Sequence, residues 1–258
     1  MKLNRIKALI YRDFLILTRA KWRIVETIYF PVTTILIWGF FALYSETIAV
    51  QAGLIVLIVN IFWNFAYIAQ STANMQIMED IWAGSLKQLF LSGITEFDYI
   101  IARLVTATIM SLIVMALILG ISFFFTPSIF LKPEELAILT LVTLIGSMAL
   151  SVIIASINVS TGREYGFFAW TVLQLFILLS APFNPVELFP KFLQYISYVM
   201  PFTFIFEGAR NLVLIGQIGN DIFLKSMISV TVYFIIGWPI YYLAFKRARR
   251  TGILAKLS

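Results

Sequence analysis

The sequence predicts an all-α membrane protein with six transmembrane helices. Of the 258 residues, 61% are hydrophobic and only 12% are charged, and the mean hydropathy is +0.94. A soluble domain is typically about half apolar and a quarter charged, so a soluble fold of this composition would lack the polar surface to cover itself. Apolar runs of about 20 residues match the length of a membrane-spanning helix. We expect one membrane domain at residues 24–258, preceded by a single helix at residues 1–23.

Residues 1–23 predict an amphipathic helix in the membrane interface. Apolar residues recur at spacings of three and four, and arginines fall seven residues apart on the other side. The apolar positions are Leu3, Ile6, Ile10, Phe14 and Leu17, and the arginines are Arg5, Arg12 and Arg19. A basic helix with one apolar face is typical of an interface helix. Without a continuous apolar core or a cleavage site, it does not predict a signal peptide. The pattern leaves open whether this helix only anchors the topology or docks specifically.

Six apolar segments are long enough, or nearly so, to cross a bilayer. They are residues 24–44, 48–69, 99–125, 136–158, 166–181 and 222–245. Pro31 is expected to kink the first, and the fifth is short for a full crossing. Arg103, near the start of the third, can extend its long side chain to the interface. Small residues at three- and four-residue spacing in the fourth allow close helix contact.

The second segment carries one polar face. Its members are Asn60, Asn64, Tyr67, Ser71 and Asn74, at spacings of four, three, four and three. Polar side chains are costly in lipid, so this face should point into the bundle or into a cavity. Hydrogen bonds between helices and the lining of a pathway both explain it.

Residues 70–98 form the longest polar connection. Residues 79–92 can form a short helix with Trp82, Leu86 and Leu89 on one side, and Gly93 can end it. Thr95 followed by Asp98 predicts a capping box, with Asp in place of Glu, and therefore a new helix start. Such a helix could pack in the interface or dock a partner.

Residues 182–216 are apolar but should not cross the membrane as one helix. The prolines that interrupt them are Pro182, Pro185, Pro190 and Pro201. A proline inside a helix removes a backbone hydrogen bond and clashes with the preceding turn, so we expect short helices that dip into one face. Asn184 and Glu187 flank Pro185 as a helix-start signature. Glu207 and Arg210, three residues apart, can form an ion pair on one helix face.

The distribution of Lys and Arg predicts the orientation. Fifteen of them lie on one side: those of the N-terminus, Lys87 in residues 70–98, Arg103, Arg163 and those of the C-terminal tail. Four lie on the other side. Cytoplasmic segments carry the excess of Lys and Arg. We therefore expect a multi-pass protein of the plasma (inner) membrane with both termini in the cytoplasm, and with residues 182–216 on the outer side.

Several kinds of chemistry are excluded. The chain has no Cys and no His, so thiol catalysis, His-ligated metals and His bases are absent, and we expect no metal site. It contains no Walker A sequence and no Gly-x-Ser-x-Gly nucleophile motif. The basic residues behind the net charge of +6 cluster at helix ends, where the orientation of the protein in the membrane explains them. Nucleic acid is therefore not an expected partner. The predicted span centres lack the ionisable groups that ion-coupled transport uses. These features favour a pore subunit that another chain drives, rather than an enzyme.

Two segments, together with this layout, resemble the type-2 ABC exporter permeases. EDIWAGSLKQLFLSGITEFDYIIARL, between the second and third spans, is similar in place and character to the coupling loop of that family. FNPVELFPKFLQYISYVMPFTFIFEGARNLV is similar to its outer signature, with Pro201, Glu207, Gly208 and Arg210 leading to the last span. The resemblance covers nearly the whole chain. It implies two permease copies, as a homodimer or with a close homologue, on two cytoplasmic ABC ATPase subunits that bind the ATP and Mg²⁺. The permease would carry no cofactor of its own, and lipids would surround it.

The resemblance also implies roles for particular residues. The ATPase-coupling residues would be Glu79, Asp80, Trp82, Leu86 and Leu89; the pathway candidates are Asn60, Asn64, Tyr67, Thr171 and Gln174; and the outer gate would contain Glu207 and Arg210. The cargo would be lipid-like, drug-like or a glycoconjugate. The alternative is a non-transporting membrane scaffold or assembly factor, which the lack of charged mid-span residues also allows.

Overall fold

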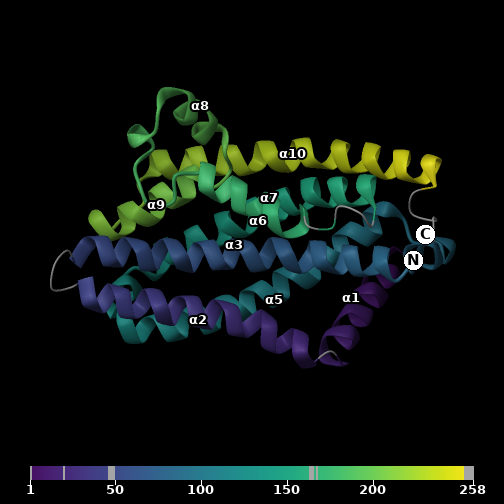
Figure 1. The fold of residues 1–258 in the computed structure, drawn as a ribbon, viewed down its shortest axis with the longest axis horizontal. Coiled ribbons are helices and arrows are strands. Elements are labelled where there is room, and N and C mark those ends of the chain that lie inside the picture. The colour runs from purple at the N-terminus through teal and green to yellow at the C-terminus, as the bar shows by residue number, and fades with distance from the viewer. Residues whose placement is uncertain (1, 20, 46–49, 163–165, 167, 253–258) are drawn as a thin grey trace.

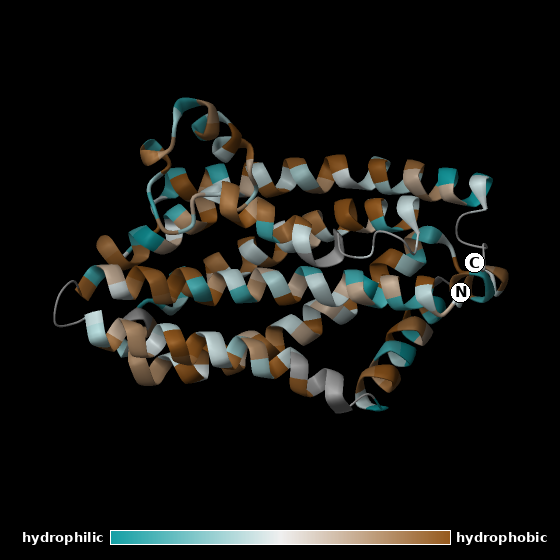
Figure 2. Cartoon of the chain, viewed as in Figure 1, coloured by the Kyte–Doolittle hydropathy of each residue, from teal (hydrophilic) through white to brown (hydrophobic). Residues whose placement is uncertain are grey.

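Long helices lie side by side along one axis in the computed structural model (Figure 1). The structure describes residues 2–19, 21–45, 50–162, 166 and 168–252, and the elements among them are helical. Within this part, five helices are long and apolar enough to cross a membrane. They are α2 (Lys21–Ser45), α3 (Val50–Trp82), α5 (Glu96–Phe125), α6 (Pro133–Thr161) and α10 (Asn220–Thr251). Figure 2 shows hydrophobic residues along the middle of these helices, as crossing a bilayer requires.

The bundle has two ends that differ in character. At one, which we call the α1 end, α1 (Lys2–Arg19) begins and α10 finishes (Figure 1). Arg249 of α10 forms an ion pair with Glu96 at the start of α5, with 2.7 Å between Nη2 and Oε2. At the other, the α8 end, lie the short helices α8 (Lys191–Val199) and α9 (Thr203–Leu214). α6 packs against α3 and α10, so it forms the middle of the bundle.

The fifth predicted span is a short helix, α7 (Phe168–Leu179). Its 12 residues cover about 18 Å at 1.5 Å per residue, against about 30 Å for the hydrocarbon core of a bilayer. α7 packs on α3 and α6. It ends where Ala181 adopts a left-handed backbone conformation, with φ of 49°, just before Pro182. Six full-length spans are therefore not confirmed: the described residues provide five, with α7 as a shorter helix beside them.

The second predicted span is longer than its apolar segment. α3 continues without a break to Trp82, for 33 residues in all, instead of ending near residue 69. The predicted helix at 79–92 is therefore wrong in its bounds. Its first residues belong to α3, a turn with Gly84 at φ of 67° follows, and α4 is Leu86–Leu91. The physical reason is that Gln70, Asn74 and Asp80 on the last turns of α3 are buried against other helices, so their polarity does not indicate exposure to water.

The start of α5 confirms the predicted capping box. The Thr95 hydroxyl accepts a hydrogen bond from the backbone N–H of Asp98, and the Asp98 carboxylate accepts one from the N–H of Thr95, both at 3.2 Å. This arrangement satisfies two donors that a helix start leaves without partners. At its other end, α5 leads through a 3₁₀ turn, η1 (Pro127–Leu131), into α6.

Residues 182–216 form short elements, as predicted. A three-residue 3₁₀ turn, η2 (Val186–Leu188), precedes α8 and α9, and Pro190 stands immediately before α8. The predicted helix start at Asn184 is wrong, because η2 has no side-chain cap and ends after one turn.

The predicted ion pair between Glu207 and Arg210 is also wrong for the residues that the structure describes. Arg210 is buried, and its Nη1 donates to the backbone carbonyls of Ala181 at 2.7 Å and Pro182 at 2.9 Å. Both carbonyls belong to the segment that follows α7, and the guanidinium gives them hydrogen-bond partners. Arg210 therefore joins α9 to this segment. Its burial lowers the pKa of the Arg210 guanidinium below its usual value, and burial raises the pKa of Glu207.

Gly53 allows α2 and α3 to approach closely. A Cβ atom at this position would lie 2.9 Å from the Cα of Ala42 and 2.8 Å from the Cβ of Ser45, which is closer than packed atoms tolerate. We expect Gly53→Leu to lower the free energy of unfolding by about 1–3 kcal/mol or more, because the two helices must separate. Thermal unfolding of the purified chain in detergent measures this effect.

Gly120→Leu is the matched control. Gly120 lies within α5, and no atom lies within 4 Å of a Cβ built there. Both changes gain the same helix propensity, of about 1 kcal/mol. An equal unfolding midpoint for the two variants would contradict the close packing of α2 on α3.

Candidate functional site

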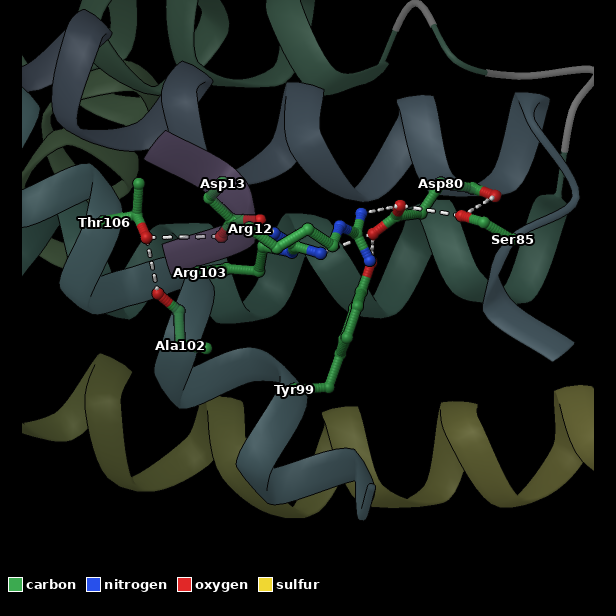
Figure 3. Close-up of polar contacts among 8 residues, drawn as sticks. All are labelled: Arg12, Asp13, Asp80, Ser85, Tyr99, Ala102, Arg103 and Thr106. Carbon is green, nitrogen blue, oxygen red and sulfur yellow. Dashed lines mark hydrogen bonds and ion pairs between the residues drawn. The ribbon is translucent and has the colours of Figure 1, made fainter. Parts of the chain in front are cut away.

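Charged side chains from three helices meet at the α1 end, around Arg103 (Figure 3). We call this group the Arg103 cluster. It consists of Arg12, Asp13, Asp80, Ser85, Tyr99, Arg103 and Thr106. α1 contributes the first two residues, α3 contributes Asp80, and α5 contributes the last three. The cluster therefore joins the N-terminal helix to both helices that flank α4.

Arg103 is the centre of the cluster and has no exposed surface (0%). Its Nη1 donates to Oδ1 of Asp13 and its Nη2 donates to Oδ2 of Asp80. Its guanidinium carbon lies 4.7 Å from the centre of the Tyr99 ring, a cation–π distance. The expectation that Arg103 extends to the interface is therefore wrong. Two carboxylates lie within reach inside the protein, and a buried guanidinium needs such partners.

Asp80 accepts four hydrogen bonds. Oδ1 receives one from Nη2 of Arg12 and one from Oγ of Ser85 at 2.8 Å. Oδ2 receives the bond from Arg103 and one from the Tyr99 hydroxyl at 2.8 Å. Ser85 stands in the turn before α4, so one carboxylate holds α1, α5 and this turn to the end of α3. The sequence prediction selected Asp80 for coupling but did not foresee these partners.

Asp13 is the second buried carboxylate. Its Oδ2 accepts a hydrogen bond from Oγ1 of Thr106 at 3.2 Å, and Oδ1 accepts from Arg103. Burial raises the pKa of the Asp13 carboxyl, and the neighbouring Arg103 opposes that rise. With two arginines and two aspartates the cluster is balanced in charge, which is the condition under which buried charges are tolerated. Sequence analysis missed Asp13. Its place one residue after Arg12, on a helix face shared with Leu9 and Leu17, is the signal that could have found it.

α1 is docked on the protein rather than only anchored to the membrane surface. Nη1 of Arg5 donates to the carbonyl of Gly93 at 2.5 Å and lies 4.0 Å from Oδ2 of Asp98. Leu9 and Leu17 are buried on the same side as Asp13. Of the two interpretations that the sequence leaves open, the structure supports docking.

The five predicted coupling residues lie together at the α1 end but differ in exposure. Trp82 is exposed, Glu79 and Leu89 are partly buried, and Asp80 and Leu86 are buried. Leu91, which the prediction omitted, is 77% exposed. The break at Gly84 separates α4 from α3, so a helix drawn continuously from residue 79 misplaces the exposed face. A role of these residues in coupling stays a prediction.

The pathway candidates make contacts typical of helix packing. Asn64 is buried and its Oδ1 accepts from Oγ1 of Thr34 on α2 at 3.1 Å. Oε1 of Gln174 on α7 accepts from Nε1 of Trp63 at 3.1 Å. Asn60 is buried and bonds to a carbonyl of its own helix, Tyr67 is partly buried, and Thr171 is exposed. Two of the five thus join α3 to α2 and α7. A pathway lining stays a prediction for the set.

The polar face of α3 continues into its contact with α6. Nδ2 of Asn74 donates to the carbonyl of Ser151, and Nδ2 of Asn158 donates to Oδ1 of Asn74, both at 3.2 Å. All three residues are buried. The small residues of α6 allow the close approach of the helices, as predicted, and amide hydrogen bonds hold the two together.

Comparison with known proteins gives one family. A family model described as "ABC-2 type transporter" matches residues 4–214, from the first turn of α1 to the end of α9. The match therefore includes the whole Arg103 cluster and both short helices at the α8 end. No curated protein matches the sequence.

Replacing Arg103 tests the cluster. We expect Arg103→Met to lower the free energy of unfolding by about 3–5 kcal/mol, because Asp13 and Asp80 would stay buried without their cation. Chemical or thermal unfolding of the purified chain measures the loss. Adding Asp13→Leu to Arg103→Met should restore part of it, because one uncompensated charge is then removed.

Lys225→Met is the control for loss of an ion pair. Lys225 and Asp221 pair on the exposed surface of α10, with 2.7 Å between Nζ and Oδ2. Exposed pairs contribute little to stability, so the unfolding midpoint should not change. Equal effects of Arg103→Met and Lys225→Met would show that the buried cluster does not hold this end together.

Proposed function

The chain belongs to the ABC-2 type transporter family, and from that premise we propose that it is the permease subunit of an ATP-driven exporter. It is a multi-pass membrane protein and a transmembrane component of an ABC transporter. The sequence has no Walker A motif with which to hold ATP. In our proposal, separate cytoplasmic ATPase subunits hydrolyse the ATP, with Mg²⁺, and two copies of the permease form the transport pathway between them.

The observation that carries the proposal is the family match together with the construction of the α1 end. α4 presents exposed side chains, and its flanks are fixed to the bundle. Ser85, in the turn before α4, donates to Asp80, and Gly93 after it accepts from Arg5. A force applied to α4 would therefore move α1, α3 and α5 with it, because packed interiors transmit displacement rather than absorb it. A surface that receives motion from an ATPase needs this property.

We propose that the chain lies in the plasma (inner) membrane and that its α1 end faces the cytoplasm. Fifteen of the nineteen Lys and Arg residues of the sequence lie in residues 1–23, at Lys87, Arg103 and Arg163, and in residues 246–258, and cytoplasmic segments carry this excess. α1 begins and α10 finishes at the same end of the bundle (Figure 1). Both termini would then be cytoplasmic, and α8 and α9 would lie at the outer face.

The outer helices would cover the exit of the pathway. Arg210 binds α9 to the segment just after α7 through two carbonyl oxygens, so an opening at this end would have to move that segment with α9 or break those bonds. The cargo in this proposal is lipid-like, drug-like or a glycoconjugate. Large apolar side chains are exposed along α2 and α5, among them Phe40 and Ile113, and they would face lipid, cargo or the second permease copy.

Leu91→Asp tests docking of the ATPase on α4. Leu91 is 77% exposed, so the change should leave the fold intact. A charge buried in the interface should weaken association by about 30-fold or more, as at a binding hot spot. The measurement is ATP hydrolysis by the complex that copurifies with the tagged chain.

Leu131→Asp is the matched control. Leu131 is 78% exposed and lies in η1, at the other end of α5. It should copurify with full ATPase activity. If both variants retain the ATPase, α4 is not the docking surface.

Transport itself is tested by reconstitution of the complex into vesicles. Cargo-stimulated ATP hydrolysis is expected of an exporter, and its absence over a panel of lipids, drugs and glycoconjugates would favour the scaffold alternative. Transport by the chain without any ATPase would overturn the proposal.

A further inference from the structure

A cavity of about 580 Å³ lies beside the Arg103 cluster, between α1, the end of α3 and α4. Its volume is that of a small-molecule site, for which about 300–1,000 Å³ is usual. Nine of the twelve residues that line it are polar or charged, but most of the surface that they turn to the cavity is carbon. An occupant that fits this wall would combine a polar group with an apolar part.

Gln76 on α3 is a buried amide side chain without hydrogen-bond partners. It lines the cavity and is only 5% exposed, yet neither its Oε1 nor its Nε2 has a hydrogen-bond partner. Arg103 also lines the cavity, and its buried Nε has no partner either. A buried polar group without a partner costs about 1–3 kcal/mol. Arg103 has no exposed surface, so its Nε is closed off from the cavity, but the two unpaired atoms of Gln76 indicate that something polar completes the site.

The wall holds two arginines and three carboxylates, and the donors that remain available on it belong to Arg12, Gln76 and Gln88. Both oxygens of Asp80 and both of Asp13 already accept hydrogen bonds from within the cluster. Glu79, a further carboxylate on the wall, has a protein contact of its own. Arg12 is partly exposed and uses one Nη for Asp80, and Gln88 at the rim is exposed. Guanidinium and amide N–H groups together are the usual ligands of an oxyanion, phosphate above all.

The position of the cavity makes two sources of phosphate accessible. α1 forms one wall, and its exposed apolar side chains, Leu3 and Leu15 among them, suit the depth of lipid headgroups. The opposite wall is the turn and helix that follow α3, which lie beyond the apolar middle of the bundle. A lipid headgroup can therefore enter from the membrane surface, and a soluble phosphate can enter from water.

We propose that this cavity binds a phosphate group, of an anionic phospholipid or of a soluble phosphate, through Arg12, Gln76 and Gln88 beside Arg103. The occupant would bridge α1, α3 and α4, and would supply the partners that Gln76 lacks. The proposal concerns binding alone and does not depend on transport or on an ATPase.

The full chain, purified in detergent and depleted of lipid, is the material for the test. Phosphatidylglycerol, inorganic phosphate and glycerol phosphate are the probes, and diacylglycerol, which has no phosphate, is the blank. Native mass spectrometry counts bound lipid, and titration of the thermal unfolding midpoint gives the dissociation constant. We expect Gln76→Leu to weaken binding about tenfold, from the loss of a buried hydrogen-bonding group.

Two further variants keep the result independent of folding. Gln88 is exposed, so either change there should leave the fold intact. Gln88→Glu should weaken binding and Gln88→Lys should strengthen it, because they bring opposite charges to the same rim. Gln70→Leu is the matched control for Gln76→Leu, since it removes a buried amide from the same helix away from the cavity wall.

The lipid and the soluble probes distinguish the two sources of the phosphate group. Binding of phosphatidylglycerol but not of the soluble probes assigns the site to a lipid headgroup, and the converse assigns it to a soluble phosphate. No binding of any probe, or binding that neither Gln88 variant nor Gln76→Leu changes, overturns the proposal.

Discussion

A buried guanidinium governs the arrangement of the α1 end. Removing Arg103 from water is unfavourable unless carboxylates of good geometry surround it, and these come from α1 and α3, 90 and 23 residues earlier in the chain. Each ion is acceptable only because the others are present. The three helices consequently pack together as a unit, and the hydrogen bond from Ser85 to Asp80 fixes the start of α4 to the same group. The connection between α3 and α5 is thus held by long-range bonds rather than by its own short helix.

Local rules of the sequence predicted some elements correctly. The capping box at Thr95 depends only on neighbouring residues, and Pro190 interrupts a helix wherever it occurs, so both could be predicted from the sequence. The partners of Arg103 and Arg210 could not. Spacing suggested Glu207 as the partner of Arg210, but the carbonyls of Ala181 and Pro182 lie 29 and 28 residues away in the chain, where no spacing rule reaches.

The same limit explains α3 and the candidate site. Gln70 and Asp80 fall in the predicted polar connection, whereas both are buried on α3. Asn74, which the sequence also places on a face pointing into the bundle or a cavity, is buried in the bundle. Inside a membrane protein polar residues mark contacts between helices as often as they mark water, and sequence alone does not separate the two. Asp80 lies in the region that the sequence selects, but it is buried and supports the helices around it; its role in coupling stays a prediction. Composition did predict the helical membrane class, because only the number of apolar residues decides it.

The separation of Asp13 from Arg103 bears on how the chain is made. They are 90 residues apart in the chain, a stretch that takes about 5–20 s to synthesise at 5–20 residues per second. Asp80, the partner of Arg12, is made before Arg103, so during that interval it is Asp13 that has no ionic partner. The apolar stripe of α1, which the finished protein only partly buries, is suited to keep the nascent helix at the lipid boundary until Arg103 follows.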